Sequence, residues 1–419
     1  MAKIKRLFAE EVLDAKGYPA IETTVVLSDG IIARSSAPSG TSKGAYEASE
    51  SRDATSKRYN GYGVLKAVDN VEKIIAPSLI GIDIYDLQKI DKLMIALDGT
   101  QNKTSLGANS ILSVSQAVAK AGAQSSHLPL YLYLKRFISW EKNPIKYPML
   151  LVVILEGGQH ADNSIDFQEI LLIPSPSKTL EEKIEIATNI YHLLRTTLLR
   201  SKLSTLTAME GGFAPRFSSN IESLQFIKKV IENSNYKLSL DVFLGIDAAA
   251  NTFCDKKLYR LKDKSSSYGH EDLIDLYQKL IAKYSIIYLE DLFAEDDWQA
   301  WQKGFRTLSK NALIVGDDLT VTNPHRLRLA LNNKVINGIV IKPNQVGTVS
   351  EAIEVVKIAR LNNLKIVVSH RSGETMDDFI ADFSIAVGAD YVKFGAPARE
   401  RVVKYNRLLG IKRETDKMT

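Results

Sequence analysis

Residues 338–370 read "GIVIKPNQVGTVSEAIEVVKIARLNNLKIVVSH", and this stretch has the pattern of a strand, a helix and a second strand. The first apolar run ends at Lys342, and the second ends at His370 and Arg371. Apolar runs without polar alternation are typical of parallel strands that are covered on both faces. A strand, a helix and a strand in succession form the repeating unit of α/β folds, so this segment predicts a parallel sheet.

Similar apolar runs occur eight times after residue 148, many of them separated by helical patterns, and together they predict an α/β barrel of the TIM type. Only a short polar segment separates the first two runs, and the gap after the second run has room for two helices. We therefore expect the barrel to open β-β-α-α and to continue as (βα)6. The eight runs are 149–158, 167–174, 242–250, 286–293, 312–320, 338–345, 365–373 and 390–397.

The first part of the chain has a different pattern. Two strand-like runs flank Asp29 and Gly30, a pair that favours a tight hairpin turn. Polar residues and two prolines mark 139–148, "SWEKNPIKYP", as a boundary. We predict an N-terminal α+β domain at 1–138 and the barrel at 139–419. Two apolar stripes predict amphipathic helices: Val64, Leu65, Val68, Val71, Ile74 and Ile75, and then Ile111, Leu112, Val114 and Val118.

Composition narrows the class of protein. The 419 residues carry a formal net charge of +5, and the basic residues are spread along the chain without zinc-ligand spacing or an RNA-binding motif, so we expect no nucleic-acid partner. Cys254 is the single cysteine, which rules out an internal disulfide. No run has the length of a signal peptide or a membrane span. We expect a cytoplasmic protein, and a surface or secreted pool stays open.

Seven successive predicted strands end in Asp, Glu, Lys, His or Arg. The carboxyl ends of barrel strands meet at one mouth, so these side chains are expected to converge there. Asp247, Glu290 and Asp317 follow three successive strands, and three hard oxygen ligands favour Mg²⁺ or Mn²⁺. A lysine beside such an ion is shifted toward its neutral form, which makes Lys342 or Lys393 a candidate base.

Several long motifs make the chain resemble the enolase family over about residues 4–411. The motifs are "APSGTSKGAYEASESRD" (37–53), "GGQHADN" (157–163), "QEILLIP" (168–174), "EGGFAP" (210–215), "LEDLFAEDDW" (289–298), "GDDLTVTNP" (316–324), "IKPNQVGT" (341–348), "SHRSGET" (369–375) and "KFGAPAR" (393–399). The resemblance implies a lyase that dehydrates 2-phosphoglycerate to phosphoenolpyruvate in glycolysis, reversibly in gluconeogenesis. It also implies two magnesium ions per site during turnover and a homodimer.

The resemblance assigns a role to each matching position. Lys342 corresponds to the base that removes the C2 proton, and Glu210 to the acid that protonates the departing C3 hydroxyl. The magnesium ligands correspond to Asp247, Glu290 and Asp317, with Ser42 reaching the second ion. The substrate-binding positions are His160, Gln168, Glu169, His370, Arg371, Ser372 and Lys393.

Some neighbouring positions depart from the usual family pattern. Met209 stands where the family usually has aspartate, Glu156 where it has asparagine, and Lys43 where it has threonine. Lys16 replaces an arginine, and "IKRET" (411–415) carries basic residues where acids are expected, so we predict a homodimer that is looser than usual. One alternative is an attenuated enolase paralogue that acts mainly as a binding or scaffold protein. An acid-sugar dehydratase on the same fold is a weaker alternative.

Overall fold

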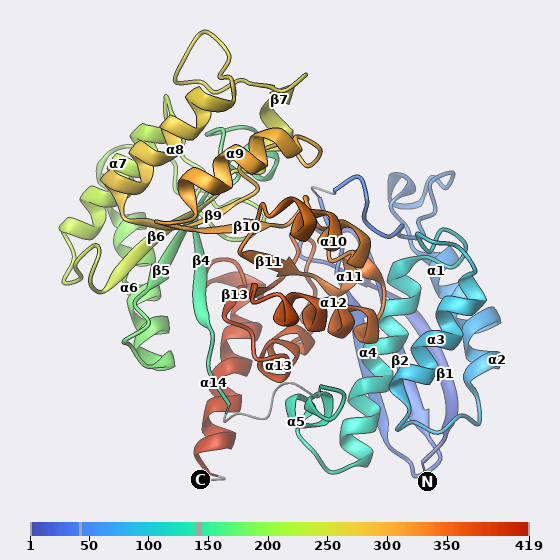
Figure 1. The fold of residues 1–419 in the computed structure, drawn as a ribbon. Coiled ribbons are helices and arrows are strands. Elements are labelled where there is room, and N and C mark those ends of the chain that lie inside the picture. Colours follow the sequence, from blue (N-terminus) through green and yellow to red (C-terminus); the bar gives the residue numbers. More distant parts are fainter. Residues whose placement is uncertain (1, 42–43, 139–144, 418–419) are drawn as a thin grey trace.

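A computed structural model describes residues 2–41, 44–138 and 145–417 of the chain (Figure 1). The predicted boundary segment 139–148 lies partly outside these residues, and Ser42 and Lys43 lie wholly outside them. Figure 1 shows the N-terminal part, in blue and cyan, packed beside the barrel that the rest of the chain forms.

The N-terminal part is built on an antiparallel sheet in the order β1-β2-β3, formed by Ile4–Leu13, Pro19–Leu27 and Ile32–Ala37. The predicted hairpin turn at Asp29 and Gly30 joins β2 to β3. Gly30 has a φ of 90°, and the Asp29 carboxylate accepts a hydrogen bond from the Ile31 N–H at 3.1 Å. The sequence pattern does not predict β1, because its exposed edge positions carry polar and basic residues.

Helices cover the sheet. Ile111, Leu112, Val114 and Val118 are all buried in α4, which packs on β2 and β3. The earlier predicted stripe is partly wrong, because Leu65 and Ile74 are exposed at its flanks. A π-helical turn at Val71–Ile75 interrupts the α-helical register of this segment. The helices are α1 (Leu65–Asn70), α2 (Ala76–Leu79), α3 (Leu87–Asp98), α4 (Ala108–Ser125) and α5 (Leu130–Lys135), with a 3-10 turn at Arg58–Gly61.

Eight strands of the described ranges close into a barrel in the order β10-β11-β12-β13-β4-β5-β6-β9. β5 is antiparallel to both of its neighbours, and the other pairings are parallel. The strands are β4 (Met149–Glu156), β5 (Glu169–Pro174), β6 (Val242–Asp247), β9 (Ile286–Glu290), β10 (Leu313–Gly316), β11 (Gly338–Ile341), β12 (Lys365–Ser369) and β13 (Tyr391–Lys393).

Helices α6 and α7 follow β5 directly, which gives the predicted β-β-α-α opening, and a helix then follows each later strand. The Thr179 hydroxyl and the Glu182 side chain form a capping box that starts α6. The helices are α6 (Leu180–Arg200), α7 (Asn220–Glu232), α8 (His270–Tyr284), α9 (Trp298–Leu308), α10 (Pro324–Asn333), α11 (Pro343–Val346), α12 (Val349–Leu361), α13 (Phe379–Ala386) and α14 (Val402–Asp416).

Shorter elements lie in the loops between the barrel strands and helices. 3-10 turns lie at Gly158–His160, Ala250–Phe253 and Arg399–Arg401, and β7 (Cys254–Asp255) pairs with β8 (Leu258–Tyr259) in a small hairpin. Within the described residues, no helix combines the length and the hydropathy needed to cross a membrane.

The inside of the barrel is apolar toward one end and polar at the other, where seven strands end and the antiparallel β5 begins. A cluster of buried side chains fills the interior. Its members are Leu151, Val153, Leu171, Ile173, Tyr288, Val315, Val340 and Val367. Above this cluster the strands end in charged residues. The N-terminal domain reaches the same mouth through an isolated bridge between Ser39 and Gly373. The fold therefore brings both domains to one polar opening.

Candidate active site

Three buried carboxylates stand at the carboxyl ends of neighbouring barrel strands. Asp247 ends β6, Glu290 ends β9, and Asp317 directly follows β10, and none of the three is more than 6% exposed. The Lys393 ammonium group lies 3.0 Å from Asp247 Oδ2 and 2.7 Å from Glu290 Oε1. The Lys342 ammonium group donates to Asp317 Oδ2. The structure thus brings the three predicted metal ligands together with the two predicted lysines.

The electrostatics of this cluster suit a bound cation. Burial raises the pKa of Glu290 to about 8, and the neighbouring Asp247 carboxylate adds to the effect. Burial also raises the pKa of Asp317, but Lys342 and Lys393 outweigh it and the net pKa is lowered. Buried carboxylates at such close range repel each other unless positive charge lies among them. The donor set of carboxylate oxygens fits a hard divalent ion such as Mg²⁺.

A second acidic group lies beside the first. Ligand oxygens of Asp291, Asp317 and Asp318 all lie within 4.8 Å of one another. However, the two carboxylate oxygens of Asp291 accept hydrogen bonds from the backbone N–H groups of Asp317 and Asp318, at 3.0 and 2.8 Å. Asp291 therefore holds the turn that carries Asp317, which is a sufficient reason for its burial.

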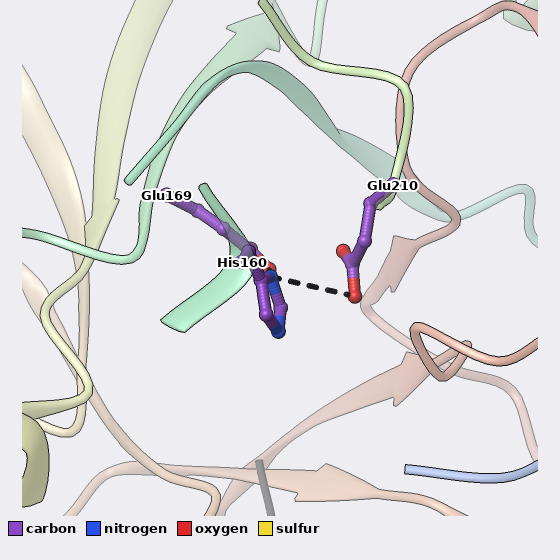
Figure 2. Close-up of side chains that lie close together, drawn as sticks. All are labelled: His160, Glu169 and Glu210. Atoms are coloured by element: carbon purple, nitrogen blue, oxygen red, sulfur yellow. Dashed lines mark ion pairs between the residues drawn. The ribbon is translucent and has the colours of Figure 1, made fainter. Parts of the chain in front are cut away.

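Across the pocket, His160 lies among carboxyl groups (Figure 2). Its Nδ1 is 3.7 Å from Glu169 Oε1 and 3.9 Å from Glu210 Oε1. Glu169 begins β5, His160 ends the 3-10 turn that follows β4, and Glu210 lies in the loop between α6 and α7. The antiparallel β4-β5 pair therefore places two residues that are nine positions apart in one corner of the pocket, opposite Glu210.

Glu210 also contacts His370, which directly follows β12. His370 Nε2 is 2.8 Å from Glu210 Oε2, and His370 Nδ1 is 3.0 Å from Arg401 Nη1. A guanidinium group can only donate, so Nδ1 accepts and Nε2 carries the proton that His370 donates to Glu210. Burial lowers the pKa of His370 to about 4, which is consistent with a neutral ring.

Arg401 is a residue of this site that the sequence did not reveal. It is buried, and its guanidinium also donates to the carbonyl oxygens of Arg371 and Ser372 at 2.6 Å and of Met209 at 2.9 Å. It lies past the last strand, in a 3-10 turn before α14, where an arginine normally reaches solvent. No pattern in the sequence marks it, because its partners come from two separate loops, one after β12 and one between α6 and α7.

The two predicted carboxyl partners differ in proton affinity. Burial raises the pKa of Glu169 well above its usual value; Glu210 adds to the rise and Lys393 opposes it. For Glu210, burial raises the pKa, but His370 and His160 outweigh that effect and lower it. Glu169, rather than the predicted acid Glu210, therefore carries the raised pKa in this structure.

The predicted phosphate binders lie where the two domains meet. The Arg371 guanidinium donates to both carboxylate oxygens of Glu47, at 2.9 and 3.2 Å. The Ser372 hydroxyl bonds the Thr41 hydroxyl at 2.8 Å. Gly40 packs so closely on Arg371 that an added Cβ would lie 1.7 Å from Nη2. Residues from the N-terminal domain therefore hold this side of the pocket closed.

One pocket collects most of the predicted residues. Among the described residues, Gln168 is buried and its Oε1 has no hydrogen-bond partner, which leaves an acceptor facing the site. Glu290 and Asp317 adjoin the pocket through Lys393 and Lys342, whereas Ser42 lies outside the described residues. The lining residues are His160, Gln168, Glu169, Glu210, Asp247, Lys342, Ser369, His370, Arg371, Ser372 and Lys393.

Comparison with known proteins matches nearly all of the chain. Residues 4–134 match the family model described as "Enolase, N-terminal domain", and residues 144–419 match "Enolase, C-terminal TIM barrel domain". A protein named Enolase from a Nitratiruptor species is 44% identical over 415 residues, which cover 99% of this chain and 97% of that protein. An Enolase from Anaplasma marginale is 41% identical over 418 residues, covering 100% of this chain and 95% of that protein.

Proposed function

The chain belongs to the enolase family, and on that premise we propose that it dehydrates 2-phosphoglycerate to phosphoenolpyruvate, as a carbon–oxygen lyase of glycolysis that runs in reverse in gluconeogenesis. One observation carries the proposal. The carboxylates, lysines, acid and phosphate-binding residues expected for this reaction come from distant parts of the chain and line or adjoin one pocket at the barrel mouth.

Lys342 is the proposed base. The C2 proton of the substrate is weakly acidic, because the neighbouring carboxylate is already ionised and a second negative charge develops there. Asp247, Glu290 and Asp317 are the residues that would hold one divalent ion, and Ser42 is proposed for a second. When bound, these ions supply electrostatic stabilisation of the new charge. The Asp317 contact fixes the Lys342 ammonium group at the end of β11, at one side of the pocket.

Glu210 is the proposed acid. The leaving group is hydroxide, a poor leaving group at neutral pH, so a proton must reach the C3 oxygen as the C–O bond breaks. The His370 N–H fixes the orientation of the Glu210 carboxyl group. Glu169 and His160 adjoin Glu210, and Gln168 and Lys393 complete the lining that would contact substrate.

Arg371 and Ser372 are the proposed phosphate contacts. A guanidinium group suits phosphate because it presents parallel N–H groups. Glu47 occupies both terminal nitrogens in the described conformation, so substrate phosphate would share or displace this contact. Because Thr41 and Glu47 belong to the N-terminal domain, phosphate binding would also engage the loop that carries Ser42.

The contacts of the described residues favour no scaffold role in place of catalysis. We further propose magnesium as the ion, two ions per site during turnover, a homodimer and a cytoplasmic location. The division at residues 138 and 139 is supported by family matches that end at 134 and begin at 144.

The test is an assay of the purified chain with 2-phosphoglycerate, in which ultraviolet absorbance follows the enol product. We expect product formation with Mg²⁺ and none after chelation. Turnover by Glu210→Gln at the rate of the parent protein would contradict the assigned acid. Absence of any turnover by the parent protein with Mg²⁺ would favour the scaffold alternative.

A further inference from the structure

Glu156, at the end of β4, contacts the turn that carries Glu210. It is buried, with an exposed fraction of 1%. Glu156 Oε1 accepts hydrogen bonds from the N–H groups of Gly212 at 2.7 Å and Glu210 at 3.1 Å, and Oε2 lies 3.0 Å from the Glu210 nitrogen. One carboxyl group therefore binds the backbone N–H groups of the turn that carries the proposed acid.

The other side of the same carboxyl group faces His160. Glu156 Oε2 is 3.7 Å from His160 Nδ1, and Glu210 Oε1 is 3.9 Å from that nitrogen. Both ring nitrogens of His160 are buried, and neither has a hydrogen-bond partner among the described residues. Glu156 and Glu210 thus approach the same imidazole nitrogen, which places the two carboxyl groups close to each other and to one buried ring.

The surroundings of Glu156 disfavour its ionised form. Burial raises the pKa of Glu156 to about 8, and the Glu210 carboxylate adds to the rise, whereas the two backbone N–H bonds and Arg401 oppose it. Two buried carboxyl groups this close cannot both ionise without a large cost, so they titrate as a pair. The titratable and charged groups that face or interact with Glu156 are Glu210, His160, Glu169, Tyr191 and Arg401.

We propose that Glu156 is a positioning residue that shares one proton with Glu210 at neutral pH and so keeps that proton available for the departing hydroxyl group. The inference rests on the proposed function, in which Glu210 is the acid. In the step itself, the Glu210 O–H bond breaks and the C3 hydroxyl oxygen gains the proton. The C3–O bond breaks at the same time and its electron pair leaves with the water molecule, while the electron pair that proton removal left at C2 forms the C2=C3 double bond. The pair is then doubly ionised until solvent returns a proton.

A purely structural role makes a different prediction. If Glu156 only holds the turn, then an uncharged side chain of the same shape serves equally well. Glu156→Gln keeps a carbonyl oxygen for the two N–H groups but cannot take or release a proton. Glu156→Ala removes the acceptor as well. The glutamine variant therefore separates proton sharing from the hydrogen bonds that hold the backbone.

The experiment compares the parent protein, Glu156→Gln, Glu156→Ala and Glu210→Gln with Mg²⁺ and 2-phosphoglycerate. Dehydration by the parent is expected to decline as the pH rises through about 8, where the pair loses its last proton. In Glu156→Gln, the remaining Glu210 is held ionised by its histidine neighbours. Its kcat at neutral pH is expected to fall roughly tenfold or more, with the alkaline decline shifted to lower pH.

Two controls define the outcome. Exchange of the C2 proton with deuterium, which needs the base but not the acid, should continue in Glu156→Gln with little change in KM. The melting temperature of Glu156→Gln should exceed that of Glu156→Ala. The proposal is overturned if Glu210→Gln is inactive and the profile of kcat against pH for Glu156→Gln nevertheless superimposes on the parent profile. If Glu210→Gln itself dehydrates normally, the assigned acid is wrong and the pairing falls with it.

Discussion

The imidazole of His370 donates from Nε2 to Glu210 across 2.8 Å, and the geometry on its other side leaves no choice of tautomer. Arg401 lies 3.0 Å from Nδ1 and can only donate a hydrogen bond, so that nitrogen is bare. An arginine outside the predicted site thus determines which ring nitrogen of His370 carries the proton that is donated to the proposed acid.

Replacing Arg401 should disturb this arrangement. In Arg401→Lys, a single ammonium group cannot reach Nδ1 and the three loop carbonyl oxygens together. We expect a loss of about 1–3 kcal/mol in unfolding free energy from unpaired buried carbonyl groups, and a kcat roughly tenfold lower. The nitrogen-15 chemical shifts of the His370 ring can be assigned by comparison with His370→Asn. In Arg401→Lys these shifts should no longer be those of a ring protonated only at Nε2. If the ring shifts and kcat both stay at their parent values, Arg401 does not set the tautomer.

A divalent ion should stabilise the protein through Asp247, Glu290 and Asp317. Because the ion binds only the folded chain, Mg²⁺ at a hundredfold excess over its dissociation constant should add about 2.7 kcal/mol of stability. The melting temperature should rise with Mg²⁺ in the parent protein and stay constant in Asp247→Asn, Glu290→Gln or Asp317→Asn. Chelation should also abolish turnover.

Asp241→Asn is the matched control for the metal variants. It lies just before the opposite end of β6, where it pairs with Lys178 at 3.0 Å, so the Mg²⁺ response should be retained. Full activity of the parent protein after thorough chelation would contradict the proposed metal dependence.

Gly40 should be intolerant of any side chain. An alanine methyl group there would lie 1.7 Å from Arg371 Nη2, and Glu47 and Asn344 restrict the movement that could relieve the overlap. Displacing a charged hydrogen-bond donor should raise KM for 2-phosphoglycerate roughly tenfold or more. Gly269→Ala adds a methyl group that meets no atom of the described residues within 4 Å and serves as the control. Equal KM values for the two variants would argue against a phosphate contact at Arg371.

The proposed homodimer should be weak and sensitive to salt. Lys16 donates a hydrogen bond to the Thr41 hydroxyl group of its own chain at 3.0 Å, and Lys412 pairs with Asp416 within α14, so both ammonium groups have partners inside the chain. Sedimentation at falling concentration should show monomer in the micromolar range, and more of it at high salt. A dimer that persists at nanomolar concentration, or a stable octamer, would mean that other contacts hold the assembly.

The barrel could be predicted because its strands are buried on both faces, which makes each of them a continuous apolar run. β1 escaped prediction because polar and basic residues interrupt its apolar ones on an edge strand. Strand ends revealed Asp247, Lys342 and Lys393, since topology alone brings them together. The roles of Arg401 and Glu156 depend on backbone atoms of distant loops, which no local pattern of residue types encodes.

The most direct test of the account follows hydrogen and phosphorus NMR signals of 2-phosphoglycerate in deuterated buffer with Mg²⁺. The parent protein should exchange the C2 proton and form phosphoenolpyruvate. Lys342→Ala should lose both, by on the order of 10²–10⁴-fold or more, because the base acts before the hydroxyl group leaves. Glu210→Gln should continue C2 exchange while product formation falls. Near-normal exchange and turnover in folded Lys342→Ala would contradict the claim that Lys342 removes the proton at this barrel mouth.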